Sequence, residues 1–112
     1  MGRGASKARG GSGGSGAAKP AGSMLNTIDK TGFKYDGMGQ YELDIPDFGG
    51  ATILDESDST RALQHGFLPG QRAYSMQVYD NDGRVTFDGW YEYLNDAKYY
   101  AKNHLKALVN LP

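Results

Sequence analysis

The stretch that decides the fold is AYSMQVYDNDGRVTFDGWYEY, residues 73–93. Apolar and polar side chains alternate on both sides of a central Asn81-Asp82-Gly83 group, which is the pattern of two half-buried strands joined by a tight turn. A loop of two or four residues would bring one set of apolar side chains to the same face: Tyr74, Met76, Val78, Val85, Phe87 and Tyr91. The sequence therefore predicts an antiparallel hairpin that buries this face.

The flanking segments predict the rest of the domain. A Gly37-Met38-Gly39 turn would pair residues 33–35 with 41–45, residues 51–54 form a short third strand, and 57–66 form a short helix. Residues 94–109 are predicted to form a C-terminal helix whose apolar stripe is Leu94, Ala97, Ala101, Leu105 and Leu108. We therefore predict an α+β fold: a small antiparallel sheet of two hairpins and a short strand, with the C-terminal helix packed on one face.

The chain divides into two parts of different composition. With 112 residues it has room for one domain. Residues 1–23 hold eight of the 17 glycines, no aromatic residue and no acid, whereas all 13 acids and all 13 aromatic residues lie in 24–112. Residues 1–23 cannot bury enough apolar surface to offset their ordering entropy. We predict a flexible basic Gly/Ser-rich tail or linker over 1–23 and a single domain over 24–112.

The tail has three interpretations. Gly22-Ser23-Met24 after a Gly/Ser run is typical of an expression linker with a cloning junction. A native tail with no role of its own fits equally well. The third interpretation is a nucleic-acid tether, carried by Arg3, Lys7 and Arg9.

Several classes of protein do not fit this sequence. The chain has no cysteine, which excludes disulfide scaffolds and thiolate sites, and it has neither a long apolar run nor a signal-like leader. We therefore expect a protein of the cytoplasm that makes no contact with a membrane. We found no phosphate-binding loop, no nucleophile motif, and no partner for His65 or His104 at metal-ligand spacing. We expect no enzymatic activity, no metal and no cofactor.

Surface aromatic and acidic residues indicate protein binding instead. Strand parity places Tyr79 and Trp90 on the polar face of the second hairpin, and aromatic residues are enriched at protein interfaces. The alternative for these two side chains is burial beneath the 55–72 loop or another strand. The residues predicted to contact a partner are Tyr79, Trp90, Asp88, Glu92, Asp55, Glu56 and Asp58.

Two other functions remain open. A nucleic-acid-associated protein would use the basic tail together with a lysine stripe at helical spacing, Lys98, Lys102 and Lys106. The net charge of −5 over residues 24–112, from 13 acids and eight bases, argues against that function. A structural or assembly component would oligomerise through a sheet edge. We expect a monomer or a homodimer.

One resemblance concerns the N-terminus. The opening MGRGASKARGG, followed by Gly and Ser, resembles the start of small bacteriophage-encoded accessory proteins. The resemblance covers about 20 residues of low complexity. It implies a phage protein that inhibits a host defence complex by occupying one of its binding sites, as anti-CRISPR proteins do, in the cytoplasm of the host.

Overall fold

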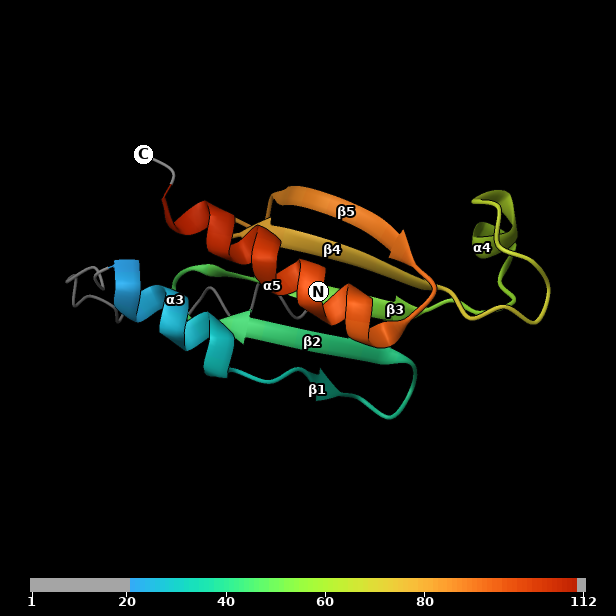
Figure 1. Ribbon diagram of the computed structural model, residues 1–112, viewed down its shortest axis with the longest axis horizontal. Helices are drawn as coiled ribbons and strands as arrows, with labels where there is room; N and C mark the ends of the chain where they lie inside the picture. The colour runs from blue at the N-terminus through green and yellow to red at the C-terminus, as the bar shows by residue number, and fades with distance from the viewer. Residues whose placement is uncertain (1–20, 111–112) are drawn as a thin grey trace.

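The computed structural model describes residues 21–110, which form a five-stranded antiparallel sheet with two helices on one face (Figure 1). Each strand pairs with the strand before it, in the order β1 to β5. The strands are β1 Lys34–Tyr35, β2 Gln40–Ile45, β3 Gly49–Asp55, β4 Tyr74–Asp80 and β5 Val85–Tyr91. The helices are α3 Ala21–Lys30, α4 Thr60–Gln64 and α5 Leu94–Val109. The predicted α+β class and the bounds of the C-terminal helix are confirmed.

The hairpin of β4 and β5 places Phe87 on the predicted face, but its loop differs in length from the prediction. Its loop has three residues, because the Asp80 amide donates to the Arg84 carbonyl at 3.0 Å, with Gly83 at φ +85°. The register then shifts, so that Val85 lies opposite Tyr79 whereas Phe87 lies opposite Val78. This bulge restores the core face for Phe87 but not for Val85. The prediction that Val85 packs in the core is therefore wrong, and this side chain is 50% exposed.

The first hairpin has the predicted turn. The Asp36 amide donates to the Gln40 carbonyl at 3.0 Å, which leaves Gly37-Met38-Gly39 as the loop. Gly37 and Gly39 have φ values of +82° and +91°, in the left-handed region that glycine adopts without strain. The outer strand at this edge of the sheet, β1, has two residues, one fewer than the predicted range 33–35.

The core lies between the sheet and α5. Ala97, Ala101 and Leu105 of the predicted helical stripe are fully buried, and Leu94 and Leu108 pack against the same cluster. Small alanine side chains let the helix approach the sheet closely. The sheet contributes these buried side chains: Leu43, Ile45, Ala51, Ile53, Tyr74, Met76 and Val78.

Helix α3 was not predicted from the sequence. It begins at Ala21, three residues before the expected start of the domain, and it places the fully buried Ile28 against α5. Its only large apolar residues are Met24, Leu25 and Ile28. A stripe this short, next to a Gly/Ser-rich segment, does not predict a helix by itself, and packing against α5 stabilises it.

The two faces of the sheet have different surroundings. We call the side that carries α3 and α5 the helix face and the opposite side the open face (Figure 1). Between β3 and β4 the chain leaves the sheet as an arm, residues 56–73, which contains α4 and extends beyond one end of the sheet. Strand register places these side chains on the open face: Gln40, Glu42, Asp44, Thr52, Leu54, Ser75, Gln77, Tyr79, Asp88 and Trp90.

Candidate partner-binding site

A pocket of about 570 Å³ lies on the open face where the arm meets the sheet. This volume is within the usual range for a binding pocket, roughly 300–1,000 Å³. Strands β3, β4 and β5 form its floor, and the arm forms one wall. Its lining residues are Thr52, Leu54, Glu56, Arg61, His65, Ser75, Met76, Gln77, Asp88, Gly89 and Trp90.

Hydrogen bonds at the base of the arm hold it in position. The Glu56 amide donates to the Ala73 carbonyl at 2.8 Å, and the Ala73 amide donates to Ser57 Oγ at 3.1 Å. Ser57 Oγ in turn donates to Asp55 Oδ1 at 2.7 Å. Further along the arm, the Gly70 amide donates to Asp58 Oδ1 at 2.7 Å. Two of the predicted partner-contacting acids, Asp55 and Asp58, thus accept hydrogen bonds from the arm.

The side chain of Glu56 forms an ion pair within the arm and a hydrogen bond to the sheet. Its carboxylate accepts two hydrogen bonds from the Arg61 guanidinium, at 2.9 and 3.2 Å, and another from the Ser75 hydroxyl. The Glu56 side chain is only 11% exposed, whereas that of Arg61 is 65% exposed. Two-point pairing fixes the plane of the guanidinium. Glu56 therefore positions Arg61 over the pocket.

Trp90 joins the arm to the sheet. The His65 ring stacks on its indole with centroids 4.4 Å apart and planes 24° apart, and the Phe67 ring lies 5.7 Å away. The Arg61 guanidinium carbon lies 5.3 Å from the indole centroid, at cation–π distance. Trp90 is half-buried, and the arm covers it as the alternative interpretation predicted. One side of the indole thus supports the arm while the residue still lines the pocket.

Asp88 occupies a different environment from Trp90, two residues along the same strand. It is exposed, and among residues 21–110 no side chain or backbone amide hydrogen bonds or ion-pairs with it. Its cross-strand neighbour Gln77 is exposed as well. The pocket therefore has one anionic group available to a ligand, beside a partly buried indole.

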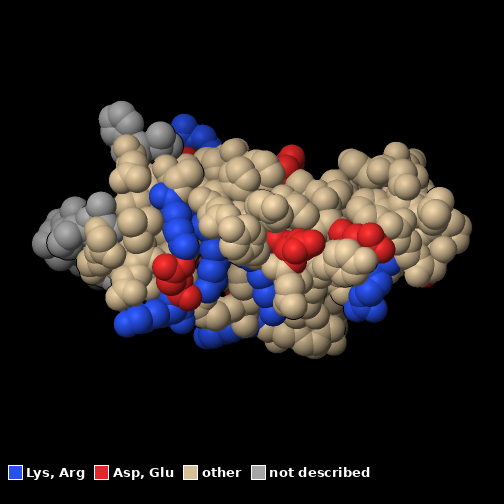
Figure 2. Space-filling model, in the orientation of Figure 1, with Lys and Arg blue, Asp and Glu red and all other residues tan. Residues whose placement is uncertain are grey.

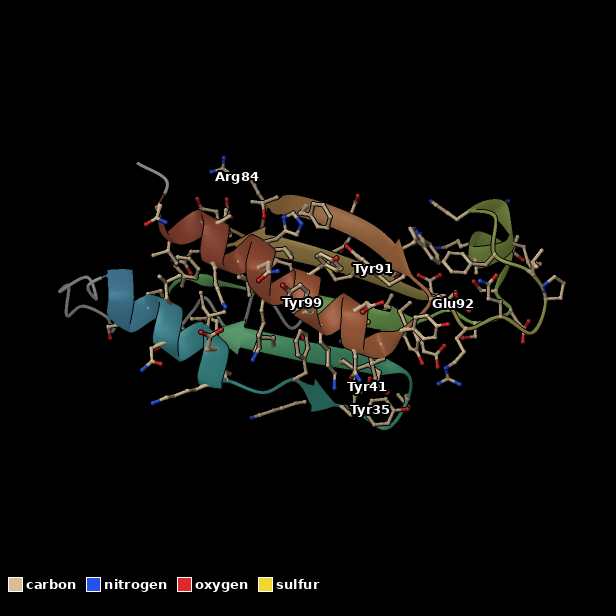
Figure 3. All side chains as sticks on the ribbon, in the orientation of Figure 1. Tyr35, Tyr41, Arg84, Tyr91, Glu92 and Tyr99 are labelled. Carbon is tan, nitrogen blue, oxygen red and sulfur yellow. The ribbon has the colours of Figure 1, made fainter. Side chains whose placement is uncertain are left out.

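The structure does not bring all seven predicted partner-contacting residues together, and two of them, Asp55 and Asp58, accept the hydrogen bonds described above. Trp90, Asp88 and Glu56 line the pocket, as expected of one shared surface. Glu92 follows β5 directly and lies near the start of the arm (Figure 3). Tyr79 is buried, as the alternative interpretation predicted, and the partner contact predicted for it is wrong: this side chain is 5% exposed, and its hydroxyl makes a 3.0 Å hydrogen bond with Thr52 Oγ1.

The three lysines of the predicted stripe make contacts within the domain. Lys106 forms an ion pair with Asp29, and the Lys102 ammonium donates to the Asp29 carbonyl at 2.9 Å. The Lys98 ammonium lies 5.3 Å from the Tyr41 ring centroid. Figure 2 shows that basic and acidic side chains are interspersed on the helix face. These contacts link α5 to α3 and to the first hairpin. The other predicted nucleic-acid contacts, Arg3, Lys7 and Arg9, lie outside the described residues.

Two arm residues that line the pocket, Arg61 and His65, were not predicted from the sequence. Both lie beside Trp90 of β5, which is more than 20 positions away in the chain, so no local spacing marks them. A partial signal exists, because Ser59 caps α4 by accepting the Ala62 amide at 3.0 Å. That cap predicts the short helix but not the surface on which it lies.

No group of three or more His, Cys, Asp or Glu side chains is placed to hold a metal ion within residues 21–110. In the same part of the chain, no helix has the length and apolarity needed to cross a membrane.

On the helix face, Tyr35 and Tyr41 stack with centroids 4.5 Å apart (Figure 3). Burial raises the pKa of Tyr91, and the neighbouring Tyr100 adds to this effect.

Comparisons of the chain with protein-family models, curated proteins and solved structures gave no match.

Proposed function

We propose that this protein is a non-enzymatic protein-binding module whose partner occupies the open face at the pocket. The observation that carries the proposal is the pocket itself, which combines a half-buried indole with the exposed, unpaired carboxylate of Asp88. Aromatic anchors beside polar groups are typical of interface hot spots. The position of the pocket between a rigid sheet and a hydrogen-bonded arm means that little ordering is needed on binding.

The nucleic-acid alternative has less support. Its three lysines on α5 contact Asp29 and Tyr41, so a phosphate would have to compete with those contacts. The acidic balance of the domain opposes phosphate binding further.

The narrower function, a phage accessory protein that blocks a host defence complex, remains a prediction. It depends on the resemblance of the N-terminal segment, most of which lies outside the described residues. A domain that occupies a partner's binding site needs a contact surface and no reaction chemistry, which agrees with the proposed class. The host cytoplasm is its predicted location.

The test is capture of a partner from a bacterial lysate on immobilised protein. We expect a stoichiometric partner with the wild type and at least tenfold less with Asp88→Lys, because a reversed charge on the open face repels the same partner. Asp82→Lys makes the same charge change at the far end of the hairpin, where Asp82 is an exposed turn residue, and it serves as the control. Equal capture by all three proteins, or none by the wild type, would refute the proposal.

A further inference from the structure

We infer that the partner of the open face is an extended basic segment that adds to the sheet as a sixth strand beside β5. This inference rests on the proposed function and names the chemistry of the partner. It predicts backbone pairing along β5, with a lysine or arginine next to Asp88 and an apolar side chain next to Trp90.

The first support is the form of the sheet edge. β5 is an outer strand of seven residues, whereas the opposite outer strand, β1, has two. Within residues 21–110, β5 pairs with β4 alone, so its outer row of amides and carbonyls has no strand partner. Such a row is a template for pairing with another chain. The bulge near Thr86 leaves Phe87–Tyr91 in regular register.

The second support is the position of the pocket along that edge. Asp88, Gly89 and Trp90 are consecutive in β5, and all three line the pocket. An added strand would lie about 4.8 Å away, with alternate side chains on the open face. Residues opposite Asp88 and Trp90 would therefore point toward the pocket. Gly89, between them, faces the opposite side of the sheet, where the Tyr91 ring occupies the space of a side chain. The Tyr91 hydroxyl lies 2.9 Å from the position that a Cβ of residue 89 would take.

The third support is charge. Residues 85–97, which include β5 and the start of α5, contain three acids and no base: Asp88, Glu92 and Asp96. Arg61, a cation that lines the pocket, is already paired with Glu56. A basic side chain on an added strand would meet Asp88 without displacing an existing partner. Opposite charges on adjacent strands stabilise the pairing, and like charges oppose it.

The same charges disfavour a second copy of this chain at the edge. Antiparallel pairing of β5 with its own copy about a two-fold axis at Asp88, the middle residue of the strand, would place the two carboxylates side by side. Repulsion in this register favours a partner of different sequence.

The test uses the full chain and a nine-residue peptide, acetylated and amidated, that alternates valine and threonine from a first valine, with lysine in place of valine at the third and seventh positions. The lysines and the remaining valines then share one face of the strand, as pairing beside Asp88 and Trp90 requires. Trp90 is the only tryptophan in the chain, so its emission reports binding at the pocket. Hydrogen exchange of the β5 amides reports strand pairing. We expect saturable binding below about 1 mM, a shift in the Trp90 emission, and slower exchange in Phe87–Tyr91.

Three comparisons separate strand addition from general charge attraction. N-methylation of the peptide amides that face β5 should weaken binding at least tenfold, since it removes the pairing donors without changing charge. Asp88→Lys should weaken binding of the lysine peptide at least tenfold and favour the peptide with glutamate at both positions. Asp82→Lys should stay within about twofold of the wild type, because exposed charges beyond about 10 Å are largely screened at ordinary salt.

Equal affinity for the methylated peptide, or no protection of β5, would overturn the inference. A homodimer seen by light scattering that dissociates when β5 is substituted would also overturn it, because a second copy of the chain would then occupy the edge. If lysate capture depends on Asp88 but the peptide does not bind, strand addition is wrong and the open-face function stands. If capture also fails, both proposals fall.

Discussion

Replacement of Trp90 by alanine should release the arm from the sheet. The indole stacks on His65 and lies beside Phe67 and Arg61, so the substitution removes all three contacts together. Truncation of a fully buried tryptophan costs roughly 3–5 kcal/mol. Because Trp90 is only half-buried and lines the pocket, we expect a smaller cost, a loss of about 2–3 kcal/mol in the free energy of unfolding.

The assay is urea denaturation followed by far-UV circular dichroism, with hydrogen exchange over residues 56–73 in parallel. A loss of this size should lower the melting temperature by roughly 10–20 °C in a domain of this length. Tyr93→Ala is the matched control, because Tyr93 is 59% exposed and should change stability by less than about 0.5 kcal/mol. A Trp90→Ala variant as stable as the control, with unchanged exchange in the arm, would refute the role of the indole.

Three further predictions concern the fold. Gly49→Ala should destabilise the protein by about 3 kcal/mol or prevent folding, because its Cβ would collide with the Tyr79 carbonyl oxygen; Gly32→Ala, with open space around its Cβ, should be nearly neutral in the same thermal melt. Ile28→Ala should cost about 2–4 kcal/mol in urea denaturation, and an unchanged midpoint would show that α3 does not stabilise the domain. The pKa of Tyr91 is higher in the folded state than its ordinary value of 10.0, so the folded protein holds the phenol proton more tightly than the unfolded chain does. The resulting stabilisation is present below pH 10.0 and is lost as the pH rises through the folded-state pKa. Unfolding free energies compared at about pH 8 and about pH 11 should therefore fall less in Tyr91→Phe than in the wild type, and an equal fall would contradict the assignment.

Local periodicity predicted most of the sheet and α5 but not the bulge in β5. Period-two alternation assigned Val78 and Phe87 to one face, and the register confirms that they are opposite each other. The same rule failed at Val85, because a three-residue loop and a bulge change the parity by one residue each. An even-numbered loop without a bulge and a three-residue loop with a bulge both place Phe87 on the core face, so alternation alone does not distinguish them.

Strand parity predicted the β5 residues of the candidate site. Parity placed Trp90 and Asp88 on the face away from the core, and register confirms this. It could not show that His65 would stack on the indole, because that contact joins two segments separated by 25 positions. Parity left the burial of Tyr79 undecided for a similar reason: its hydrogen bond to Thr52 crosses to the neighbouring strand. α3 depends on α5 in the same way.

The central claim is that a protein partner occupies the open face, and site-specific photo-cross-linking tests it most directly. A photoreactive phenylalanine analogue would replace Gln77, which is exposed and lines the pocket, and in a second protein would replace Tyr99, which is 61% exposed on α5. Exposed to light in a bacterial lysate, the protein labelled at position 77 should cross-link to one partner, and the protein labelled at position 99 should not. Cross-linking from position 99 alone would place the partner on the helix face and contradict the account.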